Sequence, residues 1–307
     1  MFRIEQYKSD KFDEWNLFIE QSKNGTFLFN RNFMEYHSDR FEDFSLLIYK
    51  KDKLIALLPA NIVGDKVYSH QGLTYGGLIL PLKIGYAIVE AIFTEIISFL
   101  KANSITNFIY KSIPFLYLKV PALELESLFI NNAAKITRRD QNFAINYKVA
   151  LDIHKTKIKH FTKNHSLGFE IKQSNNCDEF WKKVLCPRLN EKHKTTPVHS
   201  NLEMNFLMKQ FPNQIIQYDI YLDDEILAGI TIFKADTVIK SQYGATTVKG
   251  EKQRALDYLF IYLINYFKER GYHYFDMGTA TGNLGLIKQK EELGCSLYNL
   301  DQYELSL

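Results

Sequence analysis

The chain of 307 residues is long enough for two domains, and its 46% hydrophobic and 24% charged residues are an ordinary globular balance. A net charge of +3 excludes a strong overall attraction to nucleic acid or to anionic membranes. Three cysteines without metal-ligand spacing indicate reduced thiols and no structural metal. The apolar segments Ile84–Leu100 and Leu256–Phe267 fall short of the roughly 20 residues of a membrane span. We therefore expect a cytoplasmic protein.

The first half alternates short polar turns with apolar runs. Apolar residues at intervals of three and four predict helices, and short runs bounded by turn residues predict strands. The expected elements are helices at Ser9–Glu20 and Phe33–His37, strands at Ser45–Tyr49, Leu54–Asn61 and Lys66–His70, a long helix at Ile84–Leu100, a strand at Asn107–Lys111, a helix near Ala122–Asn131 and a strand near Asn142–Val149.

The second half has a similar order of elements. The expected elements are helices at Lys155–Lys163, Asp178–Glu191 and Asn201–Phe211, strands at Gly168–Gln173, Ile215–Tyr221, Glu225–Phe233 and Val238–Tyr243, a long helix at Lys252–Glu269, a strand at Tyr272–Met277, a helix near Leu286–Leu293 and a final strand at Ser296–Tyr303. Both halves thus contain three strands, a long apolar helix and a further strand.

The two halves also match residue by residue. A shift of 172 positions places Ile48–Thr74 on Ile220–Thr246 without a gap, and seven of the 27 positions are identical. Chance at ordinary composition gives about two identities. The alternative is a pair of unrelated strand meanders with similar propensities. A repeat of this length indicates duplicated domains, which we place at 1–150 and 151–307 with the active site between them.

A glycine- and lysine-containing loop precedes the second long helix. A helix N-terminus with nearby cations suits a phosphate group, although no P-loop or dinucleotide glycine pattern is present. An ordinary solvated loop is the alternative. The candidate cofactor-binding residues are Gly244, Lys249, Gly250, Lys252, Gln253 and Arg254.

Candidate catalytic residues lie at strand ends and in loops. Asp276 ends a predicted strand, where ligands gather in α/β folds, or else caps its loop. His70 and His199 are candidate bases with an ordinary pKa near 6.5, and Tyr243 is a candidate acid. The candidate substrate-binding residues are Gln71, Tyr75, Gly76, His193, Gly278 and Lys288. For Lys288 and Lys290 we favour surface charge over an anion contact, and we interpret the basic segment Lys155–Lys163 mainly as a solvated helix face.

The segment Gly271–Gly278, followed by Gly282, Ile287–Lys288 and Gly294, resembles the C-terminal signature of FemAB-like proteins. The basic segment Lys155–Lys163 and the loop from Arg188 to Ser200 are also similar. The resemblance implies an α/β (α+β) fold of two tandem GNAT-like domains, each a mixed, mostly antiparallel sheet flanked by helices.

The resemblance further implies an enzyme that transfers an acyl group to an amine. The compact chain, without sustained heptads, looks more like the FdhC-type nucleotide-sugar N-acyltransferases than like the tRNA-dependent ligases. Expected activity is transfer from acyl-CoA to the amino group of a dTDP-linked amino sugar, for lipopolysaccharide O-antigen or capsule. We expect no nucleic-acid partner and a monomer or homodimer. The alternatives are a Fem-type aminoacyl-tRNA-dependent peptidoglycan ligase and a non-catalytic module that binds nucleotide-sugar or acyl-CoA.

Overall fold

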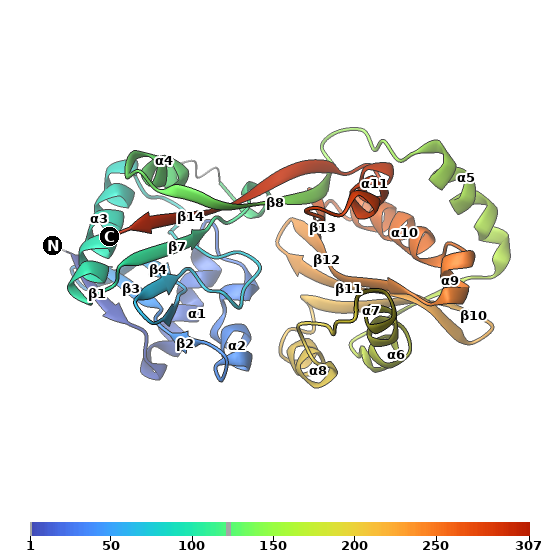
Figure 1. The fold of residues 1–307 in the computed structure, drawn as a ribbon, viewed down its shortest axis with the longest axis horizontal. Coiled ribbons are helices and arrows are strands. Elements are labelled where there is room, and N and C mark those ends of the chain that lie inside the picture. Colours follow the sequence, from blue (N-terminus) through green and yellow to red (C-terminus); the bar gives the residue numbers. More distant parts are fainter. Residues whose placement is uncertain (1, 121–123) are drawn as a thin grey trace. The chain divides into compact units, whose positions relative to one another are not determined.

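The computed structural model describes residues 2–120 and 124–307 (Figure 1). By internal contacts the chain divides into unit 1, Met1–Asp140 with Asn299–Leu307, and unit 2, Gln141–Tyr298. Strands β8 (Lys135–Asn146) and β14 (Ser296–Ser306) each contribute residues to both units. The domain ranges 1–150 and 151–307 stay a prediction. Each unit has a mixed, mostly antiparallel sheet flanked by helices, as the sequence predicts.

Unit 1 contains two sheets. Its strands are β1 (Phe2–Gln6), β2 (Glu42–Asp43), β3 (Leu46–Lys50), β4 (Lys53–Leu58), β5 (Asn61–Val63), β6 (Lys66–Tyr68) and β7 (Asn107–Lys111), and its helices of four or more residues are α1 (Phe12–Gln21), α2 (Arg31–Met34), α3 (Tyr86–Ala102) and α4 (Glu124–Asn131). Strands β1, β3 and β4 form one sheet, and β2, β5, β6, β7, β14 and β8 follow one another in the other. Ala122, where we expected α4 to begin, lies outside the described residues.

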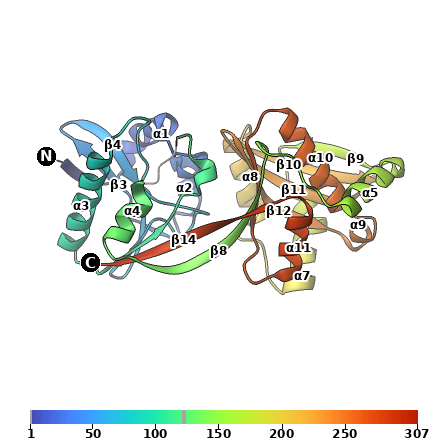
Figure 2. The ribbon, with the colours of Figure 1, turned by 90° about the horizontal axis from the view of Figure 1, so that it is seen from above.

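The expected strand Leu54–Asn61 is interrupted. Strand β4 ends at Leu58 and β5 begins at Asn61, because Pro59 has no N–H to donate to a ladder. The Phe44 N–H donates to the Ala60 carbonyl at 3.0 Å across the break. The hairpin therefore continues from one sheet into the other. Helix α3 packs its apolar face, which includes Val89, Ile92 and Ile96, into the core of this unit, and α4 lies beside it (Figure 2).

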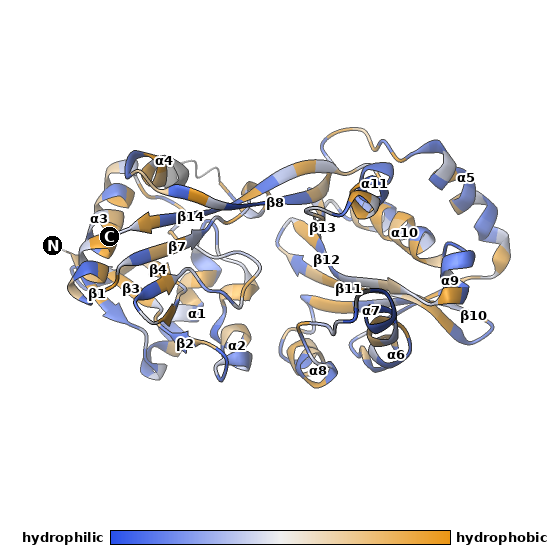
Figure 3. Ribbon diagram, in the orientation of Figure 1, coloured by the Kyte–Doolittle hydropathy of each residue, from blue (hydrophilic) through white to orange (hydrophobic). Residues whose placement is uncertain are grey.

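Unit 2 is built on the strand order β9-β10-β11-β12-β13-β8. Its strands are β9 (Glu170–Ser174), β10 (Ile215–Leu222), β11 (Glu225–Ala235), β12 (Val238–Thr246) and β13 (Tyr274–Thr279), and its helices are α5 (Lys155–Asn164), α6 (Asp178–Phe180), a π-helix (Trp181–Leu185), α7 (Cys186–His193), α8 (Asn201–Gln210), α9 (Val248–Lys252), α10 (Ala255–Glu269) and α11 (Leu284–Glu292). Helix α10 lies on one face of β10–β12, and α6–α8 lie on the other (Figure 1). Figure 3 shows that α5, packed on α10, is mainly hydrophilic, whereas α10 is largely hydrophobic.

The long helix expected at Lys252–Glu269 is α10, which begins three residues later than expected, at Ala255. Arg254 lies between α9 and α10 with a φ of 58°, in the left-handed region, so the chain turns there. Eight residues of α10 are buried, among them Leu259 and Ile264. Most of the apolar pattern that predicted the long helix therefore belongs to α10.

The strand register repeats between the units. Each pair in the β3–β4, β5–β6 and β6–β7 ladders has a counterpart in unit 2 under the sequence shifts of 172 and, for β7, 167. Ile48 pairs with Ala56 as Ile220 pairs with Ala228, and a bulge follows both pairs. Unrelated meanders have no reason to share register and bulge position, so the comparison supports duplication.

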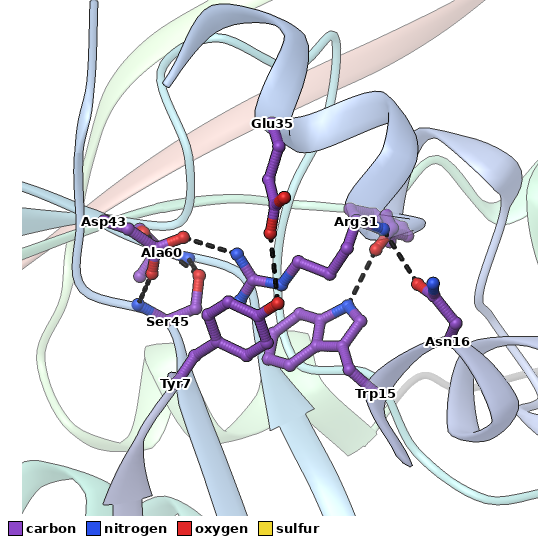
Figure 4. Close-up of polar contacts among 9 residues, drawn as sticks. Tyr7, Trp15, Asn16, Arg31, Glu35, Asp43, Ser45 and Ala60 are labelled. Atoms are coloured by element: carbon purple, nitrogen blue, oxygen red, sulfur yellow. Dashed lines mark hydrogen bonds and ion pairs between the residues drawn. The ribbon is translucent and has the colours of Figure 1, made fainter. Parts of the chain in front are cut away.

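A buried arginine organises the N-terminal part of unit 1 (Figure 4). The Arg31 side chain is fully buried, and its guanidinium carbon lies 3.3 Å from the ring centre of Tyr7 and 3.9 Å from that of Trp15. Asp43 forms an ion pair with it, and the Tyr7 hydroxyl donates to Glu35 at 3.0 Å. Desolvation by burial lowers the pKa of Arg31. Its charge is thus compensated by one carboxylate and two aromatic faces.

In the part of the chain that the structure describes, no helix combines the length and apolarity needed to cross a bilayer.

Candidate active site

Strands β12 and β13 of unit 2 pair over only part of their length. They are parallel, and Val238, Ile239 and Lys240 pair with Tyr274, Phe275 and Asp276. Beyond Lys240, β12 continues through Ser241–Thr246 paired to β11 alone among the described strands. The other edge of this stretch therefore presents backbone N–H and C=O groups that an extended ligand can bind.

Buried charged side chains lie where β12 and β13 stop pairing. Asp276 is 2% exposed; its Oδ2 lies 3.1 Å from Lys240 Nζ, and its Oδ1 accepts from Asn142 Nδ2 at 3.0 Å and from the Gly278 N–H at 2.8 Å. Gly278 has a φ of 77°, a conformation that favours glycine. Asp276 and Gly278, predicted catalytic and substrate-binding residues, thus shape the irregular end of β13, where its register with β8 shifts.

The two lysines of α11 differ. Lys288 is exposed and lies 3.9 Å from Glu292, as expected for surface charge. Lys290 is 4% exposed, so the surface interpretation is wrong for it. Its ammonium donates to the carbonyls of Met277, Gly278 and Thr279 at 2.6, 2.7 and 3.1 Å, and burial lowers its pKa to about 8. Lys290 thereby fixes the same irregular end of β13.

Two of the predicted catalytic residues lie in contact. His199 Nδ1 is 2.6 Å from the Tyr243 hydroxyl, and the His199 N–H donates to the same oxygen at 3.3 Å. The Trp181 indole donates to the His199 carbonyl at 3.3 Å and packs edge-on against the Tyr243 ring. Burial raises the pKa of Tyr243 to about 12, so its phenol stays protonated at neutral pH. The pair is positioned to exchange a proton.

The chain on either side of His199 is fixed by local signals. Ser200 and Glu203 form a reciprocal capping box at the start of α8. Pro187 follows the π-helix Trp181–Leu185, and the wider turn accommodates a residue that cannot donate its own N–H. Trp181 is the first residue of this π-helix.

A pocket of about 480 Å³ adjoins the pair. Its lining comes from the π-helix, the first residue of α7, the loop before α8 and the first turn of α8, and includes Trp181, Lys182, Cys186, His199 and Ser200. The volume lies within the range of roughly 300–1,000 Å³ typical of small-molecule sites. His193 ends α7, and its side chain is outside the described part of the structure.

Some residues of the loop predicted to bind phosphate are exposed, and others form structural contacts. Gly244 is exposed in β12, and Lys252 and Arg254 are exposed. Lys249 forms an ion pair with Glu225, and a Cβ on Gly250 would meet the Leu227 carbonyl oxygen at 2.3 Å. The Gln253 carbonyl accepts from Asn164 Nδ2 at 2.8 Å, which ties α5 to this loop.

Helix α5 brings further cations to the same place. Desolvation lowers the pKa of His160, and the charges of Arg254, Lys159 and Lys163 lower it further. Arg254 is the residue before α10, so these charges act close to the start of that helix, where free N–H groups favour an anion; Asp257 in its first turn opposes them. Sequence spacing alone does not predict this contact, because 89 positions separate Asn164 of α5 from Gln253.

Most of the candidate catalytic and substrate-binding residues of unit 1 have contacts within that unit. His70 is 3% exposed at a φ of 76°, and burial, then the charges of His37, Arg31 and Lys111, lower its pKa to about 3. Its Nδ1 accepts from the Gly72 N–H at 3.2 Å. An imidazole this weakly basic is a poor proton acceptor.

The other three residues of that loop also have packing roles. The Gln71 amide bonds with Asn61 at 2.9 Å, and the Tyr75 hydroxyl bonds with Thr26 at 3.1 Å. A Cβ on Gly76 would lie 1.6 Å from the Ser69 carbonyl oxygen, so only glycine fits. Their proposed contact with substrate stays a prediction. Within the described ranges, no group of three or more His, Cys, Asp or Glu side chains is placed to hold a metal.

Comparison with known proteins gives the fold. Neither a protein-family profile nor a curated protein sequence matches the chain. Among solved structures, FemX superposes with a TM-score of 0.70 at 9% identity, over 99% of this chain and 97% of FemX. A tandem GNAT protein from the clavulanic acid biosynthesis pathway superposes with a TM-score of 0.54 at 10% identity, over 100% and 98%.

The chain has a tandem GNAT fold. L-PGS from Bacillus licheniformis is also similar, with a TM-score of 0.63 at 16% identity over 98% of this chain and 92% of that protein. Sequence identities this low establish the fold and leave the reaction to be argued from the site.

Proposed function

We propose that the protein is an N-acyltransferase that moves an acyl group from acyl-CoA to the amino group of a dTDP-linked amino sugar used for surface polysaccharide. The observation that carries the proposal is the 2.6 Å contact between His199 Nδ1 and the Tyr243 hydroxyl. Tyr243 lies in β12, in the stretch that pairs with β11 but not with β13. A proton-transfer pair beside free backbone groups is what acyl transfer to an amine requires.

Acyl-CoA, the proposed acyl donor, is compatible with the open edge of β12 and the cations near α10. The pantetheine arm of CoA carries amide groups, and these can bond to the open edge of Ser241–Thr246 as a further strand would. The CoA phosphates are assigned to the cations at the start of α10, namely Lys159, Lys163 and Arg254. Backbone N–H groups at Tyr243 and Gly244 are the proposed donors to the oxyanion.

The reaction proceeds by direct transfer. The amine nitrogen attacks the thioester carbonyl, and a C–N bond forms while the oxygen gains negative charge. The C–S bond then breaks, the thiolate takes the proton of Tyr243, and the nitrogen loses its extra proton to solvent. His199 returns a proton to Tyr243 through their 2.6 Å contact and recovers one from solvent.

The acceptor is assigned to the pocket beside His199. Its volume of about 480 Å³ accommodates a sugar ring, and Lys182 and Ser200 offer polar contacts. In the FemAB-like family that the sequence resembles, the tRNA-dependent peptidoglycan ligases carry a long coiled-coil arm. In the described ranges, no helix is longer than the 17 residues of α3. FemX nevertheless superposes over 97% of its own length, so the helix lengths are equally compatible with both alternatives.

The test is release of free CoA thiol by the purified protein with a panel of acyl-CoA donors and dTDP-amino sugars. Tyr243→Phe should lower kcat about 100-fold, the lower range for loss of a general acid, with little change in KM for acyl-CoA. Tyr262→Phe is the matched control, since Tyr262 lies on α10 away from His199. Absence of thiol release above background across the panel would refute the proposal.

A second candidate is an aminoacyl-tRNA-dependent ligase, which the similarity to FemX and the cations near α10 favour. Such an enzyme would bind charged tRNA with an affinity that falls steeply as salt rises. Binding that is weak and independent of salt would exclude it.

A further inference from the structure

Unit 1 has its own pocket, between the β3–β4 hairpin and the segment that leads into α3. Its volume is about 730 Å³, within the range of small-molecule sites. Its apolar lining includes Leu54, Ile55, Leu82, Ile84 and Ile88, and Leu82 leaves 53% of its surface exposed. The interior therefore favours an alkyl chain over a polar ligand.

Lysines supply all the side-chain charge of this pocket. Lys23, Lys50, Lys53 and Lys83 line it, and none of its described lining residues is acidic. Lys50, Lys53 and Lys83 are exposed, and they form no ion pair within the described ranges. The first turn of α3, which begins at the pocket wall, holds no acidic residue either. The field in the pocket favours an anion.

Comparison with unit 2 shows where the pocket comes from. The Leu57–Ile79 bridge is the counterpart of the Gly229–Ala245 pair, because Leu57 and Gly229 are related by the shift of 172. Two residues further on, the Thr247 N–H donates to the Leu227 carbonyl at 2.8 Å and α9 begins. Unit 1 has Pro81 at that place, which cannot donate.

Helix α9 covers this surface in unit 2. Lys249 of α9 forms an ion pair with Glu225, and Gly250 packs directly on the Leu227 carbonyl. The counterparts of Glu225 and Leu227 in unit 1 are Lys53 and Ile55, both in the pocket lining. Unit 1 therefore has an open pocket where α9 covers unit 2, with Lys53 in place of Glu225.

We propose that the unit 1 pocket binds a single-chain anionic amphiphile, an alkyl or acyl chain that ends in a phosphate or carboxylate. The chain contacts the apolar lining, and the head group lies among Lys50, Lys53 and Lys83. Neither feature alone would select this class, since bare phosphate leaves the apolar surface wet and a neutral chain leaves the lysines without a counterion. The described lining of this pocket shares no residue with the His199–Tyr243 pair or with the pocket beside His199.

The test is calorimetric titration of the full-length protein with dodecyl phosphate below its critical micelle concentration. We expect one site per chain. Replacing Lys50, Lys53 and Lys83 together by Gln should weaken binding about tenfold, from about 0.5 kcal/mol for each exposed charge pair. Replacing Lys66, Lys101 and Lys135 by Gln is the matched control and should leave the affinity unchanged, because these exposed lysines of unit 1 lie outside the pocket.

Further variants and ligands distinguish binding of an anionic amphiphile in this pocket from binding at other sites and from binding of other ligands. Leu82→Asp, at an exposed position that tolerates change, should also weaken binding, whereas Tyr243→Phe should not, whether or not thiol release is observed. Inorganic phosphate and dodecyl maltoside should bind far more weakly than dodecyl phosphate. The proposal is overturned if dodecyl phosphate does not bind, if the three-lysine variant binds it equally well, or if only vesicles of anionic phospholipid are bound.

Discussion

Replacing Asp276 by Asn tests whether this carboxylate is structural or catalytic. Asn retains an oxygen for the Asn142 and Gly278 donors but removes the charge that faces Lys240 at 3.1 Å. The Lys240 side chain is 9% exposed, so its ammonium would stay buried without a counterion. Loss of one partner of a buried pair costs about 3–5 kcal/mol. We expect the free energy of unfolding of unit 2 to fall by this amount.

The assay is urea unfolding followed by tryptophan fluorescence. The chain has two tryptophans, Trp15 in unit 1 and Trp181 in unit 2, so a Trp15→Phe background leaves a single reporter in unit 2. The double variant Asp276→Asn/Lys240→Met should recover most of the loss, because an apolar side chain needs no counterion. Lys288→Gln, at an exposed position, should change stability by less than about 0.5 kcal/mol. Loss of thiol release with unchanged unfolding would refute the structural role.

Three other substitutions have defined outcomes. Burial raises the pKa of Asp219 to about 7, so between about pH 4 and 7 the native state holds a proton that the unfolded chain releases. The stability of the protein should therefore fall as the pH rises through that window. The thermal midpoints at pH 5 and pH 8 should differ less for Asp219→Asn than for the unchanged protein. Gly250→Ala places a Cβ 2.3 Å from the Leu227 carbonyl and should cost about 1–3 kcal/mol, which a lower thermal midpoint would reveal. Asp43→Asn weakens the charge-assisted bond to buried Arg31 and should cost about 1.5–3 kcal/mol in chemical denaturation; an unchanged midpoint would show that the aromatic rings suffice.

Element order and residue identities under one sequence shift predicted the repeat, because strand register is a local property. A ladder conserves the spacing of its residues, so a shift of 172 positions carries Ile48 and Ala56 onto Ile220 and Ala228 together. The same reasoning failed where a single residue changed the backbone. Pro59 divides a strand although the apolar pattern continues on both sides of it, and Arg254, with its left-handed backbone, delays the start of α10 to Ala255.

The site was less predictable because its residues meet through tertiary structure. His199 and Tyr243 were separate candidates, and their contact depends on the loop before α8 folding onto β12. Lys290 belongs to a short, mostly polar helix, and nothing in its neighbours indicates the three carbonyls that its ammonium binds. The Arg31 cluster was missed for a similar reason, since Tyr7, Trp15 and Asp43 have no motif spacing.

The two shared strands have a consequence for folding during synthesis. Strand β14 pairs with β7 through Gln302–Ser306, residues that leave the ribosome only after all of unit 2. Until then β7 lacks this neighbour, and its exposed edge is a template for pairing with another chain. Unit 2, being continuous in sequence, can complete its own sheet earlier. The half of the protein that is synthesised first is therefore the half that is finished last.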